Sequence, residues 1–544
     1  MMKKVLFFLT VLSLAWIANA QEDVTALPYS FTHKDVSYSI DEMTLPAVNR
    51  EALLSEDAQN IKNGTPMRIG VNHHVGYTFD NCGRTDILSN GAKLWRLGIK
   101  SEGAVSLSVY FSQFNIPEGA TLHIYNGDRS QVTGTYTNAD IQQNGILVSD
   151  DIDDDNLVIE YYEPADVLYH GTIMIDRISH RYRDISKIPM SDNDKALSGS
   201  CHFNASCPEG NGWRDQINSV VRIEITCSDG TYLCSGALIN NTRYDKTLYV
   251  LSANHCLNDD MNSTFKFFFK YETTSCDVNE YGFVNQWVKG GAIVATDGLQ
   301  NSSDFLLLKI TGNMNRINLD DVFFAGWDVS GAASVGMAIH HPAGDFKKLS
   351  IPKAVSSNYY NGYWTTSWYV NPQKGCTEQG SSGSPLFNGK KLIIGDLSNG
   401  SSSCSEPWGT DNYGKISYSW TNNNNYNNAK KLKPWLDPDN TGVTWIPGMR
   451  YDGTIVGVEQ HEADIRTFSI YPNPSTGQVS IQGHFDAEKG ICNVYNMMGA
   501  KLGSYNVNLE PTFSMSFNDL PSGIYVVEIL GGTHTYKSKM VITR

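Results

Sequence analysis

The chain has 544 residues, which suggests three or four domains of about 150 residues each. Its formal net charge of −15 argues against nucleic-acid binding, because a phosphate backbone is bound by clustered Lys and Arg. Abundant Gly, Asn, Ser, Tyr and Thr, with little helical periodicity, favour an all-β protein with many turns.

Residues 1–20 have the pattern of an export signal. Two lysines precede an apolar run from Val5 to Ile17, and a small-x-small cleavage pattern ends at Ala20. The run is too short for a comfortable membrane span, and no later segment reaches about 18 apolar residues. We expect a cleaved signal peptide, with an uncleaved anchor as the alternative, and a product that is secreted or held at the cell surface.

Residues 21–195 are predicted to form a β-rich first region. Alternating runs at 105–111 and 120–125 are typical of strands, and a turn is expected at 126–128. The acidic run from Asp150 to Asp155 could hold calcium, but such a run is more often a solvated loop, and the loop is the favoured interpretation.

Eight of the ten cysteines lie between Cys201 and Cys404. In an exported chain an even cluster of this kind predicts a disulfide framework. A zinc site is the alternative, and it is disfavoured because no Cys-x-x-Cys pair is present. We expect no metal, and no motif implies a cofactor.

The predicted middle domain, residues 196–449, contains the candidate catalytic residues. His255 follows a hydrophobic strand and precedes Cys256, which is the arrangement of a rigidly held general base; Cys234 is the natural partner of Cys256. Asp304 lies just ahead of a buried apolar run, where an aspartate can orient that histidine. The alternative for Asp304 is a cap at the start of a strand.

The nucleophile is predicted in the block Thr377–Pro385. Glycines on both sides of Ser382 permit a tight turn that exposes its hydroxyl, and the backbone N–H groups of Gly380 and Ser382 can then bind an oxyanion. Ser381 and Ser384 are rival nucleophiles, disfavoured because neither has both flanking glycines in those places.

The chain order His, Asp, Ser excludes an α/β-hydrolase, which runs Ser, Asp or Glu, His and needs Gly-x-Ser-x-Gly. The arrangement that remains is a chymotrypsin-like double β-barrel with the triad between its barrels. His340 and His341, at a strand edge that enters a turn, are interpreted as structural.

The middle domain resembles the lysyl endopeptidase family along nearly all of residues 196–449. The resemblance is carried, in order, by Ser198–Cys201, Cys207–Gly210, Cys234–Gly236, Asn254–Cys256, Phe324–Asp328, Ile339–Pro342, Thr377–Pro385 and Ser402–Ser405. It implies a serine endopeptidase that cleaves proteins or peptides after lysine.

The resemblance also implies the specificity site. It places Asp411 at the base of the pocket for the substrate lysine, where a desolvated ammonium needs an opposite charge, and Glu378 is a secondary candidate for the pocket wall. An aspartate in an exposed loop is the alternative for Asp411. The best-studied relatives carry a histidine where this chain has Ser398.

Three disulfides are implied by the same resemblance. They are Cys201–Cys404, Cys207–Cys276 and Cys234–Cys256. Cys227 and Cys376 are left over and could form a fourth, although sequence cannot choose among the pairings.

Lys195 directly precedes the segment that resembles the mature start of the family, so a lysine-cleaving enzyme could release its own first region there. Because Ser381, and not an aspartate, precedes the nucleophile, pairing of a new N-terminal amine with that position cannot activate the enzyme. We expect activation by removal of an occluding or chaperoning pro-region.

The last region, residues 467–544, follows a linker predicted at 450–466. Short alternating strands predict a small β-sandwich. Its Tyr-Pro-Asn-Pro opening at 471–474 and its Gly-Ile-Tyr strand at 523–525 resemble the sorting domain of the type IX secretion route. That resemblance implies outer-membrane secretion machinery as a partner; an adhesion or carbohydrate-binding module is the alternative.

Two further functions stay open at this level. One is a serine protease of other or broader specificity, and the other is an inactive adhesion protein with a protease-like domain. Reactivity of Ser382 toward a fluorophosphonate, followed by cleavage-site profiling, would separate them.

Overall fold

The computed structural model describes residues 27–544, except 34–35, 37–38, 61–64, 142–144, 186–197, 277–285, 299–302, 332, 358–361, 422–425, 457–467, 486, 497–500 and 532–533. The chain forms two compact units, Met1–Trp445 and Ile446–Arg544. The predicted signal peptide with Ala20, the processing site at Lys195 and most of the predicted linker lie outside the described residues.

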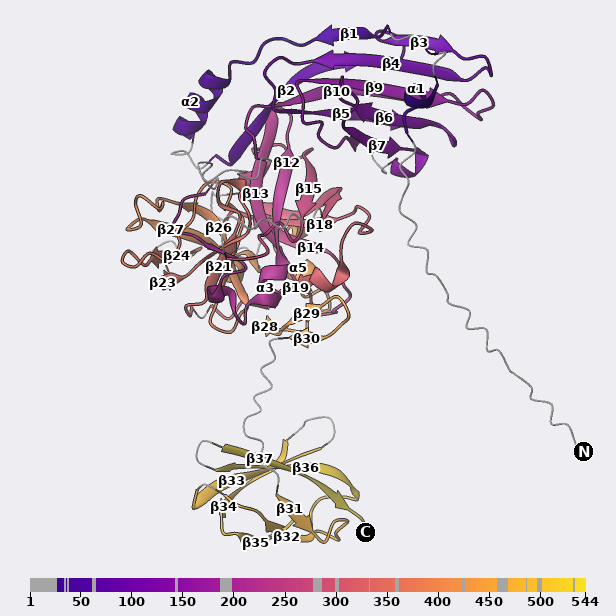
Figure 1. The fold of residues 1–544 in the computed structure, drawn as a ribbon. Helices are drawn as coiled ribbons and strands as arrows, with labels where there is room; N and C mark the ends of the chain where they lie inside the picture. The colour runs from indigo at the N-terminus through magenta and orange to yellow at the C-terminus, as the bar shows by residue number, and fades with distance from the viewer. Residues whose placement is uncertain are drawn as a thin grey trace, which may run out of the picture. The chain divides into compact units, whose positions relative to one another are not determined.

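The first part of unit one is built from two sheets, as Figure 1 shows. One has the order β1-β4-β9-β6-β7 with β3 on β4, and the other contains β2-β10-β5-β8. Alternate side chains from both sheets share one core, which includes Leu97 of β4, Val109 of β5 and Ile159 of β9. The bounds are β1 (Asp41–Thr44), β2 (Met67–Tyr77), β3 (Arg84–Ile87), β4 (Lys93–Lys100), β5 (Ser106–Asn115), β6 (Thr121–Tyr125), β7 (Val132–Tyr136), β8 (Leu147–Val148), β9 (Asn156–Glu163) and β10 (Thr172–Arg181).

The second part of unit one begins with a half-barrel. Its strands run in the order β16-β15-β12-β13, and β13 continues through β14 and β18 to β17. β18 is paired on both edges, by β14 and β17, and the run Phe305–Leu308 within it is fully buried. The bounds are β12 (Val220–Thr226), β13 (Gly230–Leu238), β14 (Tyr249–Ala253), β15 (Thr264–Phe268), β16 (Trp287–Lys289), β17 (Gly291–Asp297) and β18 (Phe305–Ile310).

A second half-barrel follows, with strand order β11-β22-β21-β25-β26-β27-β24-β23. The predicted all-β, double-barrel protease architecture is therefore confirmed. The bounds are β11 (Phe203–Asn204), β19 (Phe323–Phe324), β20 (Trp327–Asp328), β21 (Met337–His340), β22 (Lys348–Ser350), β23 (Pro352–Ser357), β24 (Tyr363–Trp368), β25 (Pro385–Phe387), β26 (Ile393–Gly400) and β27 (Thr410–Lys415).

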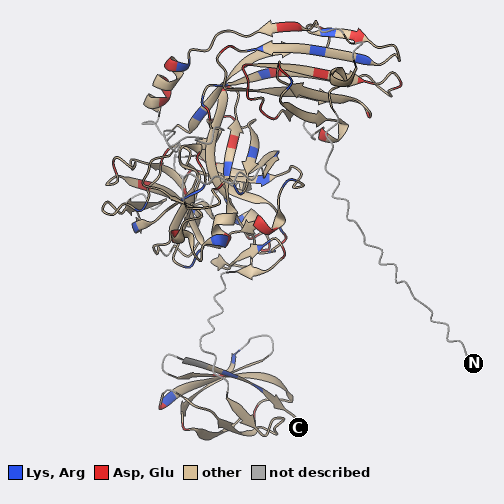
Figure 2. Ribbon diagram, viewed as in Figure 1, with Lys and Arg blue, Asp and Glu red and all other residues tan. Residues whose placement is uncertain are grey.

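The helices of unit one are short. They are α1 (Tyr29–Thr32), α2 (Arg50–Asn60), α3 (Arg214–Ser219), α4 (Ile416–Ser419) and α5 (Lys433–Leu436). No helix within the described ranges is long and apolar enough to cross a membrane. Figure 2 shows basic and acidic residues interspersed over the strands of this unit.

The acidic run at 150–155 is only in part the solvated loop that the sequence favoured, because Asp153 is exposed but Asp150 and Asp151 are paired. Asp150 pairs with Lys289 at 2.8 Å, and Asp151 pairs with Arg181 at 2.9 Å. Nearby lysines lower the pKa of Asp150, although burial alone would raise it. These basic partners are distant in the sequence, so the run could not be read as paired before the fold was known.

Unit two ends in a small β-sandwich. A sheet β31-β32-β35 faces a sheet β34-β33-β36-β37 across one apolar core that includes Ile481, Val494 and Val527. The predicted sandwich is confirmed. The bounds are β29 (Gly448–Arg450), β30 (Ile455–Val456), β31 (Ser469–Tyr471), β32 (Gln478–Gln482), β33 (Lys489–Asn496), β34 (Lys501–Asn508), β35 (Thr512–Ser516), β36 (Gly523–Gly531) and β37 (His534–Ile542).

Candidate active site

His255 lies at the end of a strand of the first half-barrel. β14 ends at Ala253, and a short 3₁₀ turn over Asn254–Leu257 carries the histidine. The Cys234–Cys256 disulfide fastens this turn to β13. Only 11% of the imidazole is exposed, so the ring is held by its surroundings on nearly every side.

Asp304 is brought to His255 by strand register. It directly precedes β18, and Phe305 of β18 lies opposite Ala253 of β14. The Asp304 carboxylate is fully buried and accepts hydrogen bonds from the backbone N–H of His255 at 2.9 Å and from its Nδ1 at 2.7 Å. This geometry favours the tautomer that keeps the proton on Nδ1 and presents Nε2 to a nucleophile.

The loop that carries Ser382 needs glycine on both sides. Gly380 and Gly383 have φ values of +86° and +78°, which L side chains rarely adopt. A Cβ at Gly380 would lie 2.9 Å from two backbone atoms, and one at Gly383 would lie 2.7 Å from the nitrogen of Ala253. Because these positions lack side chains, the loop can approach the end of β14 at Gly383 and the turn at His341–Gly344 at Gly380.

Ser382 is held between the two half-barrels. Its carbonyl accepts a hydrogen bond from Ser235 N of β13 at 2.8 Å, and Gly383 N donates to Leu397 O of β26 at 2.7 Å. Among the described residues, the N–H groups of Gly380 and Ser382 make no hydrogen bond. Two donors beside the hydroxyl are therefore available to an oxyanion.

Nε2 of His255 has no hydrogen-bond partner among the described residues, so it makes no hydrogen bond to the Ser382 hydroxyl. Catalytic hydrogen bonds of this kind often shorten only when substrate is bound. A buried aspartate, an oriented imidazole and a serine on a glycine-flanked turn can carry out acyl transfer.

Asp411 is fully buried on β27. Its Oδ2 accepts hydrogen bonds from Trp368 Nε1 and Thr377 Oγ1, both at 2.7 Å, and from Ser402 Oγ; Ser402 N donates to Oδ1 at 3.1 Å. Burial raises its pKa above the ordinary value, and the hydrogen bonds counteract this. No basic side chain pairs with Asp411 among the described residues. Its carboxylate is therefore surrounded by neutral hydrogen-bond donors and has no positively charged partner.

Glu378, expected on the pocket wall, engages the start of the protease domain. Its carboxylate accepts from Gly199 N at 3.1 Å, and it lies 3.5 Å from His202. Its side chain is 20% exposed, so it is less deeply enclosed than Asp411.

His340 and His341 are both buried. His340 bonds Ser381 Oγ at 2.7 Å and Ser350 Oγ at 2.8 Å, and Nδ1 of His341 bonds the carbonyl of Asp345 at 3.0 Å. Burial holds the pKa of each histidine well below its ordinary value, so both are neutral. The contact of His340 with Ser381 braces the nucleophile loop, and both histidines have contacts in keeping with a structural role.

Two residues lie near the candidate site: Ser398, which the sequence analysis noted only as a departure from the relatives, and Asp396, which it missed. Ser398 Oγ donates to Asp304 Oδ2 at 2.7 Å, so the orienting carboxylate has a further donor. Asp396 is fully buried, and neither of its oxygens has a partner among the described residues. Burial, and then the charge of Asp304, raises the pKa of Asp396 well above its ordinary value.

The disulfides implied by the resemblance are present: Cys201–Cys404, Cys207–Cys276 and Cys234–Cys256. The expected fourth bond between Cys227 and Cys376 is wrong, because both are free thiols and they lie in different half-barrels. Burial raises the pKa of each thiol to about 12.

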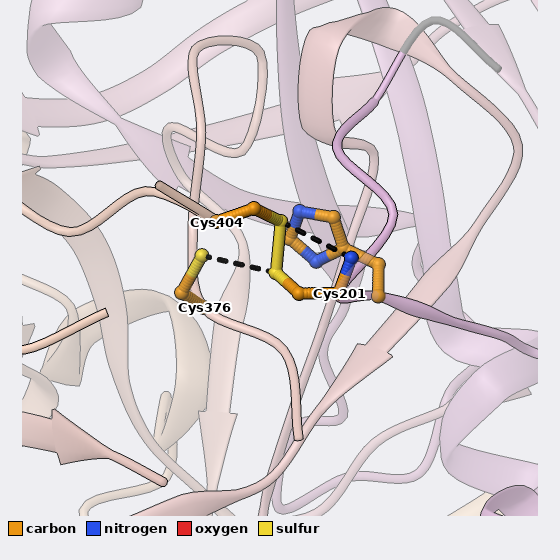
Figure 3. Close-up of side chains that lie close together, drawn as sticks. Cys201, Cys376 and Cys404 are labelled. Atoms are coloured by element: carbon orange, nitrogen blue, oxygen red, sulfur yellow. Dashed lines mark hydrogen bonds between the residues drawn. A yellow bond between two sulfur atoms is a disulfide. The ribbon is translucent and has the colours of Figure 1, made fainter. Parts of the chain in front are cut away.

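Cys376 lies instead beside an existing disulfide. Figure 3 shows its sulfur directed at Cys201, with 3.6 Å between the two Sγ atoms. Together with His202 and Cys404 they form a group whose ligand atoms lie within 4.8 Å of one another. Two of the three sulfurs are used in the Cys201–Cys404 bond, so the oxidised group does not offer a four-ligand zinc site.

Comparisons with known proteins agree with this architecture. The family model of the lysyl endopeptidase C-terminal domain matches residues 196–414, and that of the lysyl endopeptidase N-terminal domain matches residues 44–182. The model of the secretion system C-terminal sorting domain matches residues 469–543.

Individual relatives include the lysyl endopeptidase of Pseudomonas aeruginosa, which is 29% identical over 370 residues, 64% of this chain and 78% of that protein. The secreted RxLR effector protein 73 of Plasmopara viticola is 24% identical over 310 residues, 52% of this chain and 71% of that protein. Among solved structures, the protease Anisep from Arthrobacter nicotinovorans has 19% identity and a TM-score of 0.29, covering 39% of this chain and 93% of its own.

The two lysyl endopeptidase models together account for the region of the two β-sheets and for the double barrel with the candidate site. The sorting domain accounts for the terminal sandwich and makes the product secreted or surface-held. The chain therefore belongs to the lysyl endopeptidase family of serine endopeptidases.

Proposed function

We propose that the protein hydrolyses peptide bonds on the carboxyl side of lysine, with Ser382 as nucleophile, His255 as general base, Asp304 as the orienting carboxylate and Asp411 as the group that binds the substrate lysine.

In this proposal the Ser382 oxygen attacks the carbonyl carbon while its proton passes to Nε2 of His255. The N–H groups of Gly380 and Ser382 stabilise the oxyanion that forms. The protonated imidazole then gives its proton to the leaving amine, and water hydrolyses the acyl-enzyme by the same steps. Asp304 stays ionised throughout and stabilises the imidazolium.

The observation that carries the lysine preference is the isolation of Asp411. A buried carboxylate without a counter-charge is costly, and a substrate ammonium brought next to it supplies the missing partner. Removal of the first region by cleavage after Lys195 is part of the same proposal, since a lysine-specific enzyme can cut there itself.

The test is labelling with a fluorophosphonate and then cleavage-site profiling on a peptide library. The wild-type chain should be labelled and should cut after lysine, whereas Ser382→Ala should lose both properties. Ser384→Ala is the matched control, because it removes a neighbouring hydroxyl of the same loop and should keep the label. Labelling of Ser382→Ala, or cuts spread over residues other than lysine, would overturn the proposal.

A further inference from the structure

Three cysteines and a histidine meet in the second half-barrel, outside the proposed triad. Cys201 and His202 precede β11, Cys376 lies between β24 and β25, and Cys404 lies between β26 and β27. One possible ligand atom from each of the four lies within 4.8 Å of the other three. The sequence argument against zinc relied on the absence of a Cys-x-x-Cys pair, whereas the fold brings these side chains together from distant segments.

The three sulfur atoms are close enough to share one metal ion. Cys376 Sγ is 3.6 Å from Cys201 Sγ, and Figure 3 shows this contact beside the Cys201–Cys404 disulfide. Zinc binds thiolates at about 2.3 Å, which sets two sulfur ligands of a tetrahedral site about 3.8 Å apart. In the oxidised chain the disulfide uses two of the three sulfurs, so breaking this one bond makes all three available.

His202 can supply the fourth ligand through Nε2. Its side chain is fully buried, and Nε2 has no hydrogen-bond partner among the described residues, although the Glu378 carboxylate lies 3.5 Å away. The Ser350 hydroxyl donates its proton to the carbonyl of Cys376 at 2.7 Å, so its oxygen can only accept from Nδ1 of His202, 3.4 Å away. In the neutral ring the proton is then on Nδ1, which leaves the lone pair of Nε2 for a metal.

The surroundings of Cys376 favour a cation. Burial, and then the carboxylates of Glu378 and Asp411, raise the pKa of its thiol to about 12. The protonated thiol is a poor attacker of the adjacent disulfide, because thiol–disulfide exchange needs the thiolate. A bound metal ion removes the proton outright, and thiolate with imidazole selects zinc over magnesium or calcium.

We infer that reduction of the Cys201–Cys404 disulfide converts this group into a zinc site, with Cys201, His202, Cys376 and Cys404 as ligands. A dithiol supplies two electrons and two protons, so that the disulfide becomes two thiols and the dithiol becomes a disulfide. Zinc then binds the three sulfurs and Nε2, and the three thiol protons pass to solvent. This inference does not depend on the proposed lysine preference.

The zinc ion would join the same segments as the disulfide does. Thr377, next to Cys376, donates to Asp411 at 2.7 Å, and Ser402, shortly before Cys404, donates to the same carboxylate through its N–H at 3.1 Å. Either link therefore ties the donors around Asp411 to the start of the protease domain. The reduced, metal-free chain has neither link, so we expect weaker lysine binding there, and this consequence rests on the proposed function.

The test measures metal binding by the untagged full chain with Ser382→Ala, which avoids self-digestion. A phosphine is the reductant, since it becomes a phosphine oxide with oxygen from water and, unlike a dithiol, supplies no thiolate to bind metal. Cobalt(II) is the optical probe, because tetrahedral cobalt thiolate sites absorb visible light far more strongly than hydrated cobalt does. The reduced chain should bind a single cobalt ion with this spectrum, zinc should displace it, and the oxidised chain should not show it.

Cys376→Ser is the deciding variant, because it removes one sulfur and leaves the disulfide partners in place. In the reduced chain it should weaken zinc binding on the order of 100-fold or more, since loss of even an outer-shell partner typically costs about 10- to 100-fold in metal affinity. Cys227→Ser is the matched control: it removes the other free, fully buried thiol of the protease domain, and zinc affinity should not change. Circular dichroism of the oxidised chains shows which variants have folded.

Equal zinc affinity of the reduced Cys376→Ser chain and its parent would overturn the inference, as would a cobalt spectrum without thiolate absorption in the parent. An equal loss in Cys227→Ser would overturn it too.

The link to the pocket is measured with the active chain and a lysine reporter. Zinc should lower the KM of the reduced chain and should not do so in reduced Cys376→Ser; oxidised chain with the same zinc controls for inhibition elsewhere. An unchanged KM beside the expected cobalt spectrum would refute the link and leave the metal site standing. Failure of the oxidised wild-type chain to prefer lysine would instead contradict the proposed function.

Discussion

Replacing Asp411 by Asn should remove the preference for lysine and leave the catalytic machinery in place. The side chain keeps its shape, and its remaining oxygen can still accept from Trp368 Nε1 or Ser402 N. What is lost is the charge in a fully buried site and one of these two acceptors. Removing one member of a buried ion pair costs about 3–5 kcal/mol, which corresponds to roughly a 10²- to 10⁴-fold fall in kcat/KM for lysine substrates.

The assay compares kcat/KM for peptides that differ only in lysine or an uncharged residue of similar length before the bond. The lysine peptide should lose activity and the uncharged one should not. Glu378→Gln is the matched control, and it should change the lysine value by less than tenfold because its carboxylate bonds Gly199 N. An equal loss on both peptides would refute the reasoning, since it would mean that Asp411 supports the fold and not the substrate.

Asp411 also predicts a pH effect of known sign. Burial raises its pKa, so in the free enzyme it takes up a proton at a higher pH than an ordinary aspartate does. Lysine binding needs the ionised form, so kcat/KM for lysine peptides should fall on acidification at a pH above the ordinary aspartate range. Peptides with an uncharged residue before the bond should not show this fall in kcat/KM. The same fall with those peptides would contradict the role of Asp411 in binding lysine.

Three further outcomes are expected. Asp304→Asn should lower kcat on the order of 10⁴-fold with little change in KM, measured on a lysine reporter; a fall below tenfold would contradict its orienting role. Ser398→Ala removes a hydrogen bond to a buried carboxylate and should lower kcat by roughly tenfold or more, with partial rescue by Ser398→Thr. The pKa values of His340 and His341 are depressed in the folded chain, so on acidification the unfolded state takes up protons at a higher pH than the folded state does. The free energy of unfolding should therefore fall as pH drops below about 6.5. Denaturant unfolding of the Ser382→Ala chain should show the free energy of unfolding falling by up to about 1.4 kcal/mol per pH unit for each histidine. His340→Asn should halve the pH dependence that the two histidines produce together.

The residues of the candidate site could be predicted from the sequence because the prediction depends on short local patterns. The glycines around Ser382 are required by backbone conformation, and a histidine next to a half-cystine is a compact signal. Asp304 was found because the apolar strand after it is unmistakable, and strand register then sets it beside His255.

The features that sequence reasoning missed depend on partners far apart in the chain. Pairing of β2 with β13 uses main-chain groups, so it leaves no side-chain pattern to detect. The acidic run at 150–155 was read as solvated because its basic partners lie elsewhere in the sequence. The pairing of Cys227 with Cys376 was wrong for a related reason, since the assignment of thiols to different half-barrels is a property of the fold.

Ser398 bears on how the buried Asp304 carboxylate is satisfied in this chain. Asp304 is fully buried, so its charge must be balanced by donors. It has three of them: the backbone N–H of His255, the Nδ1 of the same residue and the Ser398 hydroxyl. Burial, and then the charge of Asp304, raises the pKa of Asp396, the other acid close to it, so a second negative charge there is disfavoured. A serine hydroxyl is uncharged at every pH of interest, whereas a histidine there would titrate. The Ser398 hydroxyl therefore supports the buried Asp304 carboxylate as an uncharged donor, beside the two donors that His255 supplies.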